Sequence, residues 1–241
     1  MQILRCTITL HESVYYATRE LGTLYETGQY LHNYALSYAL FNDSHIQVPY
    51  FCATYRPAYR ADLARLQAAG IYVTPAAPVA VDFLLATWKI GQVTYYRRSE
   101  QFGGKNYPAN IGRAKELAPE STFVCYVLSS TPLDLPRWVR LGKWHGKALV
   151  EAEPLDVHEH DGPFVAAGPL NPLDVPPGVL QAFDIVSMPP SSLVINARGV
   201  GRYYAVAGPE RGIPIGLRYN VPEPPPEAGG RGRRRQERGL P

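Results

Sequence analysis

The sequence lacks the marks of a helical membrane protein and of a disulfide-stabilised one. No apolar run reaches the roughly 18 residues that a bilayer-spanning helix needs. The first residues, MQILRCTITLHES, have no basic stretch before a long apolar core, so we expect no signal peptide there. The three cysteines, Cys6, Cys52 and Cys125, are widely spaced. This spacing disfavours a disulfide framework or a zinc site and predicts three small apolar residues in a reducing, cytoplasmic protein.

The motifs of the common enzyme classes are also missing. The sequence contains no GxxxxGK[ST], no GxGxxG after a predicted strand, no GxSxG and no HExxH. A metal-independent RNA-cleaving site would need a histidine paired with a tyrosine or lysine near a 2′-hydroxyl. His11 beside Tyr15 and His145 beside Lys147 could form such pairs, but so could many unrelated residues. We therefore predict no catalytic residue and no cofactor.

One short segment, DVHEHDG at residues 156–162, has the composition of a metal site. On a strand, His158 and His160 would point to the same face, with Asp156 and Asp161 nearby. No cysteine or distant histidine cluster accompanies them, and metal sites usually gather such ligands. We expect a polar surface loop here and no bound metal.

Apolar periodicity predicts an α+β fold with an antiparallel sheet. Residues 2–10 alternate, which predicts a half-buried strand. Helical spacing at 30–40 predicts an aromatic-rich helix, and 56–70 reads as a second helix with Gly70 at its end. Further strands are predicted at residues 71–74, 79–88, 122–128, 147–153, 192–197 and 202–208. Because strands outnumber helices and βαβ alternation is irregular, a doubly wound parallel sheet is disfavoured.

The positive charge is concentrated at the end of the chain. The net charge is +3 over 241 residues, and residues 222–241 hold five arginines and three glutamates among many prolines and glycines. Such a composition cannot bury a core, so we predict one domain at 1–221 and a disordered tail at 222–241. The domain itself is nearly neutral, so nucleic-acid binding there would need basic groups gathered on one surface.

The segment from Tyr95 to Leu117, YYRRSEQFGGKNYPANIGRAKEL, combines flat faces, cations and glycines. Single-stranded nucleic acid is bound by stacking faces, phosphate partners and unobstructed backbone amides. A solvated hairpin tip with scattered tyrosines is the alternative. The residues of this segment that we expect to contact RNA are Tyr95, Arg97, Arg98, Lys105, Tyr107 and Arg113.

A second basic segment, RWVRLGKWHGKALV at residues 137–150, places glycines, cations and tryptophans just before a predicted strand. A glycine-rich basic loop can bind phosphates through its amides. An ordinary tight hairpin is the alternative. The candidate contacts here are Lys143, Trp144, His145 and Lys147.

Taken in order, several segments resemble a known family. They are RCTITLHESVYYATRELGTLYETGQYLHNYALSYAL near the start, NYPANIGRAKELAPESTFVCYVLS in the middle, RLGKWHGKALVE, GPLNPLD and MPPSSLVINARGVGRYYAV. Together they resemble the Cas-five-type (Csc-one) subunit of type I-D CRISPR effector complexes, over most of residues 2–207. The arginine-rich tail lies outside the resemblance.

The resemblance implies a ferredoxin-like, RRM-like domain of the RAMP superfamily with an inserted β-hairpin thumb, here at about residues 83–117. It implies a non-catalytic subunit that caps the 5′ handle of the crRNA and contacts the backbone and large subunits of the complex. Contact with target DNA near the protospacer-adjacent motif is left open. A metal-independent endonuclease that processes repeat RNA is the alternative. Arg19, Tyr25 and His32 lie in the best-matching region, where they either bind the handle or pack against the sheet.

Overall fold

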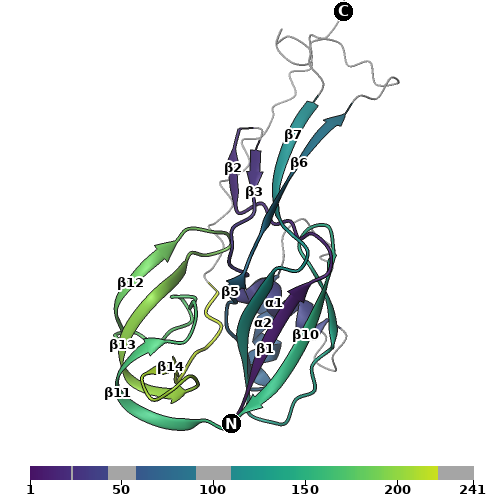
Figure 1. Cartoon of the computed structure of the whole chain (residues 1–241). Coiled ribbons are helices and arrows are strands. Elements are labelled where there is room, and N and C mark those ends of the chain that lie inside the picture. The colour runs from purple at the N-terminus through teal and green to yellow at the C-terminus, as the bar shows by residue number, and fades with distance from the viewer. Residues whose placement is uncertain (23, 43–57, 91–109, 222–241) are drawn as a thin grey trace, which may run out of the picture.

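The computed structural model describes residues 1–22, 24–42, 58–90 and 110–221. Within these residues the chain is mostly β, with two helices and three sheets. Two sheets lie side by side in the body of the molecule, and the third projects away from them (Figure 1). Strands therefore dominate over helices, as the sequence predicted.

The largest sheet, here called the main sheet, carries the core. Its strand order is β4-β8-β1-β10-β9, β5 pairs with β8, and all of its pairings are antiparallel. The strands are β1 (Gln2–Leu10), β4 (Ile71–Val73), β5 (Ala77–Ala80), β8 (Thr122–Ser129), β9 (Trp138–Leu141) and β10 (Gly146–Leu155). In β1 the predicted alternation is confirmed, because Leu4, Cys6, Ile8 and Leu10 are buried and the residues between them are half-buried.

Both helices pack on the face of the main sheet that these residues occupy. They are α1 (Asn33–Phe41) and α2 (Tyr59–Ala68), which confirms the two predicted helices. Gly70, predicted to end the second helix, lies just beyond α2 and has a positive φ of 68°. Leu63 and Leu66 of α2 are fully buried in this core. Because α1 contacts both β4 and β9, at opposite ends of the strand order, the main sheet curls around it.

A second sheet covers part of the other face of the main sheet. It consists of β11 (His158–Ala166), β12 (Leu180–Val186), β13 (Leu193–Ala205) and β14 (Arg211–Pro214). Its core residues, among them Val194 and Ile213, cluster with Ile3, Tyr72 and Tyr126 of the main sheet. The two sheets therefore share an apolar interface, and the body has helices on one side and a sheet on the other.

Two sequence predictions about this second sheet are wrong. Residues 192–197 and 202–208 were predicted as separate strands, but β13 is continuous across them. Gly199 marks a close approach inside the strand, since a Cβ there would lie 2.6 Å from the Val179 carbonyl oxygen and 2.9 Å from the Phe164 ring. Residues 156–162, predicted as a loop, mostly belong to β11, whose exposed polar residues pair with β13.

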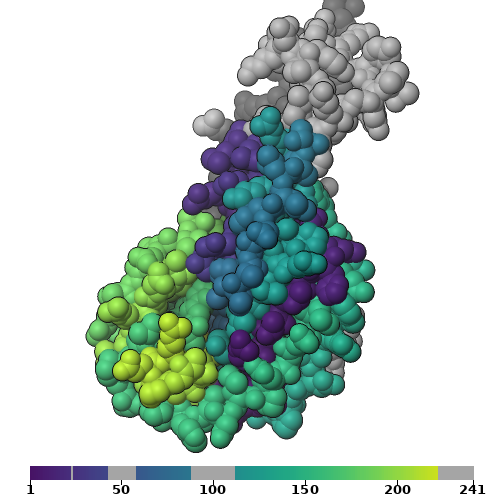
Figure 2. Space-filling model, in the orientation of Figure 1, coloured from purple at the N-terminus to yellow at the C-terminus, as the bar shows by residue number. Residues whose placement is uncertain are grey.

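The third sheet, here called the projecting sheet, has the order β2-β3-β7-β6. Its strands are β2 (Arg19–Leu21), β3 (Leu24–Glu26), β6 (Phe83–Ile90) and β7 (Asn110–Leu117). β6 and β7 pair antiparallel from Phe83 opposite Leu117 to Ile90 opposite Asn110, and β3 pairs parallel with β7. In Figure 2 this sheet stands on the junction between the two lobes of the body.

The predicted strand at 79–88 is in fact two strands in different sheets. β5 ends at Ala80 in the main sheet, and β6 begins at Phe83 in the projecting sheet. Asp82 fixes the crossing, because its N–H donates to Ser121 Oγ at 3.2 Å and its carbonyl accepts from the Ala118 N–H at 2.9 Å. The stretch VAVDFLLATW is mostly apolar and contains no glycine or proline at this corner, so nothing in it marks the break.

A buried polar network joins the parts of the body. Asp174, beside the second sheet, accepts hydrogen bonds from Asn33 Nδ2 and Tyr72 OH, both at 2.9 Å, and from the Asn220 N–H at 2.9 Å. Burial raises the pKa of its carboxyl from 3.8 to about 6, although these donors favour the ionised form. One carboxyl thus links α1, the main sheet and the segment after β14.

Candidate nucleic-acid interface

The second basic segment forms a tight turn between β9 and β10, here called the glycine turn (residues 142–147). It packs directly on the backbone of the segment that follows β1. A Cβ on Gly142 would lie 2.7 Å from the Tyr15 carbonyl oxygen, and one on Gly146 would lie 2.5 Å from that of Ser13. The Lys143 N–H donates to the Tyr15 carbonyl at 2.8 Å. Both glycines are therefore required by close approach, and Gly142 also has a φ of 76°.

An ion pair fastens the turn at its other side. Glu12 accepts from Arg140 Nη1 at 3.0 Å and from the Lys147 N–H at 2.8 Å. Arg140 also donates to the His145 carbonyl at 3.1 Å. The guanidinium of Arg140 is thus occupied in holding the turn, which leaves Lys143 and Lys147 as its cations for a ligand.

Two tryptophans are exposed here, Trp144 in the turn and Trp138 in β9 beside it. Trp144 is 46% exposed and stacks on Tyr15, with ring centroids 4.4 Å apart, while Lys143 Nζ lies 5.9 Å from the Tyr15 ring. Trp138 is 44% exposed, and Lys147 Nζ lies 4.0 Å from its ring centroid. His11 meets the Trp138 ring edge-on at 5.0 Å. This arrangement offers flat faces for bases beside cations for phosphates.

Tyr15 and Trp138 were not among the predicted contact residues, and the structure adds them to the turn. Tyr15 lies more than 120 positions away in the sequence, so only the fold brings it under Trp144. Trp138 begins the second basic segment. In a hairpin across residues 142–146 it pairs with Leu149 and lies diagonally opposite Lys147, so hairpin pairing was the signal that could have identified it.

Three of the other predicted residues lie on the projecting sheet. Arg19 is in β2, Tyr25 in β3 and Arg113 in β7, where Tyr25 pairs with Ala114 and Arg113 with Leu24. Arg19 and Arg113 are exposed, and Tyr25 is half-buried. They share a sheet with one another but not with the glycine turn.

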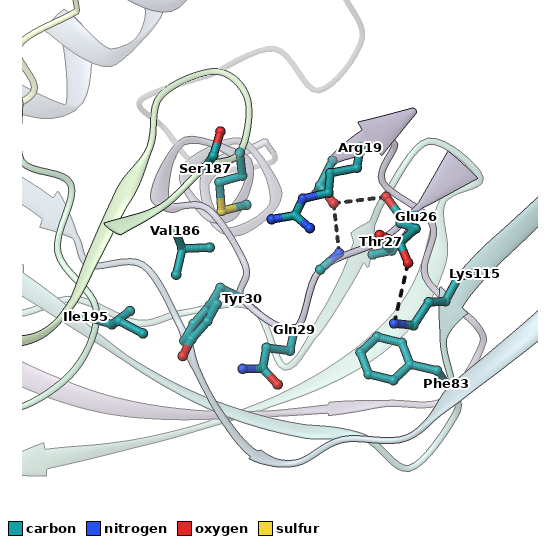
Figure 3. Close-up of a pocket in the computed structure, with 13 residues that line it drawn as sticks. Arg19, Glu26, Thr27, Gln29, Tyr30, Phe83, Lys115, Val186, Ser187 and Ile195 are labelled. Carbon is teal, nitrogen blue, oxygen red and sulfur yellow. Dashed lines mark hydrogen bonds and ion pairs between the residues drawn. The ribbon is translucent and has the colours of Figure 1, made fainter. Parts of the chain in front are cut away.

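Arg19 also borders a pocket between the projecting sheet and the second sheet. The pocket has a volume of about 320 Å³, and its lining includes Gln29, Tyr30, Phe83, Lys115 and Val186 (Figure 3). Lys115 Nζ lies 4.2 Å from the Phe83 ring centroid and 3.9 Å from a Glu26 oxygen. The sequence could not reveal this pocket, because its walls come from five separate segments.

His32 has the packing role that the sequence analysis left open. It is 4% exposed and forms the N-cap of α1, where its Nδ1 accepts from the Tyr34 N–H at 3.2 Å. Its Nε2 lies 3.0 Å from Ser191 Oγ. Burial lowers the pKa of the imidazole to about 4, so it is neutral near pH 7. A buried neutral capping residue is not placed to contact a phosphate.

The remaining predicted contacts, Tyr95, Arg97, Arg98, Lys105 and Tyr107, lie outside the described residues. So do Cys52 and the predicted tail. Cys6 and Cys125 are buried free thiols that face each other across the β1–β8 pair, as expected for small apolar residues.

Within the described ranges, no group of three or more His, Cys, Asp or Glu side chains could hold a metal ion. His160 instead stacks on Tyr203, with ring centroids 5.7 Å apart. In the same residues, no helix is long and apolar enough to cross a membrane.

Comparison with known proteins identifies the family. The family model of the type I-D CRISPR-associated protein Cas5/Csc1 matches residues 1–222 of the 241-residue chain, which include all of the described residues. The chain belongs to this family. No curated protein is significantly similar to it in sequence. Among solved structures, it is similar to a chain of the type III-B Cmr-beta complex, determined by cryo-EM with cognate target RNA and AMPPnP. The identity is 10%, the TM-score is 0.45, and the match covers 82% of this chain and 86% of that one.

Proposed function

We propose that this Cas5/Csc1 family member is a non-catalytic RNA-binding subunit of a type I-D CRISPR effector complex, in which it caps the 5′ handle of the crRNA. Membership in the family supports a role in the effector complex. The observation that carries the RNA contact is the glycine turn together with β9 beside it. There the exposed Trp138 lies beside Lys147, and the exposed Trp144 stacks on Tyr15, which Lys143 approaches. In this proposal the subunit also contacts the backbone and large subunits in the cytoplasm during antiviral DNA targeting.

The main sheet supports a ferredoxin-like assignment. Four of its strands have the order β4-β8-β1-β10, which is second-third-first-fourth in the chain when the other strands are left aside. Both helices lie between β1 and β4, as a first crossover requires. The second crossover, between β8 and β10, contains β9 and no helix. We therefore interpret the domain as ferredoxin-like with a modified second crossover.

We further interpret β6 and β7 as the base of the inserted thumb. Their pairing begins at Phe83 and Leu117, the limits predicted from the sequence. Leu84 (48% exposed) and Leu85 (63% exposed) are consecutive in β6 and point to opposite faces of the sheet, so both faces of the base carry exposed apolar side chains. A thumb that holds RNA or a neighbouring subunit would use such exposed apolar side chains together with its cations.

The test uses a 5′-labelled, repeat-derived RNA with the full-length chain in the presence of a chelator. One native gel and one denaturing gel are run. We expect a shifted, uncut RNA that is preferred over a scrambled strand. A discrete cut in chelator would contradict the non-catalytic assignment and favour the endonuclease, with His11 and His145 as the first residues to substitute.

The salt dependence of binding gives a sharper readout. Substituting Lys143 and Lys147 together by alanine removes two phosphate partners, so the slope of log affinity against log salt should become shallower by about 1.4, or about 0.7 per contact. The matched control replaces Arg198 on β13 and Arg218 after β14, both exposed, by alanine. It removes the same charge, and its salt slope should stay closer to that of the wild-type protein. Equal slope changes in both variants would mean that the turn holds no phosphate.

A further inference from the structure

The pocket between the projecting sheet and the second sheet has a fixed polar wall. Thr18 Oγ1 donates to the Glu26 carbonyl and accepts from the Gly28 N–H, both at 2.9 Å. Thr27 Oγ1 donates to the Tyr16 carbonyl at 2.8 Å and accepts from the Tyr16 N–H at 3.0 Å. These bonds hold the segment from β2 to residue 30 in place, so the pocket is preformed. Its volume of about 320 Å³ is at the lower end for small-ligand sites.

The cation available to a ligand in this pocket is Arg19. Its guanidinium makes no hydrogen bond or ion pair with the described residues, and Figure 3 shows it pointing from β2 toward Val186. Lys115, the other cation in the lining, has Glu26 at 3.9 Å and lies over the Phe83 ring. The planar fork of an arginine matches the oxygens of a phosphate. The pocket therefore has one site for an anion.

The remaining lining suits a flat heterocycle. Val186, Met188 and Ile195 form an apolar wall from the end of β12 and from β13, and Tyr30 adds an aromatic ring. Thioethers and aromatic rings make favourable contacts with flat π-systems. Gln29 is exposed at the pocket, and its amide carries both donors and an acceptor, which the edge of a nucleobase requires.

We propose that this pocket binds one nucleotide, with its base against the Val186–Met188 wall and its phosphate on Arg19. The proposal rests on the proposed function for one point, that the nucleotide belongs to a bound RNA strand; a free nucleoside monophosphate has the same chemistry. Tyr15, beneath the glycine turn, is four residues from Arg19, so their backbones are at most about 14 Å apart. An RNA strand of a few nucleotides can therefore occupy the turn and the pocket together.

The first arm of the test uses a single-stranded repeat-derived RNA with 4-thiouridine at every uridine. After irradiation and digestion, mass spectrometry locates the cross-linked peptides. We expect cross-links at Gln29–Tyr30 or at 186–188, and a loss of about tenfold in the Arg19→Ala variant, since the charged phosphate contact is removed. The control Arg218→Ala removes an equal charge from an exposed site outside the pocket and should leave these cross-links unchanged.

The second arm uses 8-azidoadenosine 5′-monophosphate alone, and adds unmodified nucleoside monophosphates to the RNA reaction. Labelling of the pocket that falls with Arg19→Ala would identify a free nucleotide as a ligand, as would loss of the RNA cross-links on competition. Cross-links that persist against competition would assign the nucleotide to the strand.

Different outcomes would overturn the nucleotide pocket and the proposed function. RNA that cross-links at the glycine turn but not at the pocket would overturn the nucleotide pocket and leave the proposed function standing. RNA that cross-links nowhere would overturn the proposed function, and the azido-nucleotide arm would then decide the pocket alone. Azido labelling that is absent from the pocket or unaffected by Arg19→Ala would reject it. Because Arg19 is exposed, a melting curve should show that the variant folds as the wild type does.

Discussion

Single residues of the glycine turn have separate tasks. Gly142 and Gly146 allow the backbone to approach residues 13–15, Glu12 fastens the turn, and the tryptophans remain exposed. Of the stacked pair, Tyr15 is buried (6% exposed), whereas Trp144 is nearly half exposed. The outer face of Trp144 is therefore preoriented for a base.

Replacing Trp144 by alanine should weaken binding of the handle RNA about tenfold, because base–aromatic stacking contributes about 1–3 kcal/mol per base. Trp144→Phe should retain most of the affinity. The matched control is Phe183→Ala, which removes an equally exposed aromatic ring (43%) from β12. Affinities are measured by fluorescence anisotropy, and an unchanged affinity for Trp144→Ala would exclude this ring from the interface.

At the scale of elements, the sequence was informative wherever one face of a long element is buried. β1, β8, β10, α1 and α2 were predicted because their apolar residues repeat over eight or more positions. β2 and β3 were missed because they have three residues each and none of them is buried, whereas the equally short β4 was predicted from a fully apolar, buried run. The glycine turn was predicted from its composition, whereas Tyr15 and the pocket depend on contacts between distant segments.

Adding a single methyl group to a glycine of the glycine turn should also destabilise the protein. Gly146→Ala places a methyl group 2.5 Å from the Ser13 carbonyl oxygen and 2.9 Å from Val14, so one strand end must shift. We expect a destabilisation of about 1–3 kcal/mol, as for overpacking elsewhere, together with weaker RNA binding. Gly168→Ala is the control, because a Cβ there meets nothing within 4 Å.

Urea unfolding measures both variants. Equal stabilities of Gly146→Ala and Gly168→Ala would show that the contact between the turn and residues 13–15 is not tight in solution.

At the scale of the whole molecule, two buried titratable groups act on stability in opposite directions. The carboxyl of Asp174 has its pKa raised by burial to about 6, so the folded state binds its proton more tightly than the unfolded state does. The free energy of unfolding that protonation of Asp174 contributes is therefore lost as pH rises from about 4 to about 6. The imidazole of His32 has its pKa lowered by burial to about 4, so its contribution is lost as pH falls from about 6.5 to about 4.

These two effects nearly cancel in the wild-type protein, and substitution should separate them. Asp174→Asn should leave stability rising with pH between 4 and 6, because the contribution of His32 is then no longer opposed by that of Asp174. His32→Asn, which keeps a capping oxygen, should leave stability falling over the same range. Each slope amounts to about 3 kcal/mol across the window.

Chemical denaturation at pH 4, 5, 6 and 7 provides the measurement. The slope with pH, rather than the absolute stability, is compared, since both substitutions also disturb buried hydrogen bonds. Variants with parallel slopes would contradict the opposed contributions of the two groups.

The base of the projecting sheet is attached to the chain segment that lies beneath the glycine turn. Val14 and Leu117 exchange two backbone hydrogen bonds, both at 3.0 Å, where β7 enters the body, and β3 braces the same strand from the side. β7, and β6 paired with it, are thus anchored to the body at Leu117. The residue after Val14 is Tyr15, on which Trp144 stacks. The attachment point of the projecting sheet and the exposed tryptophan of the glycine turn therefore share one short stretch of backbone.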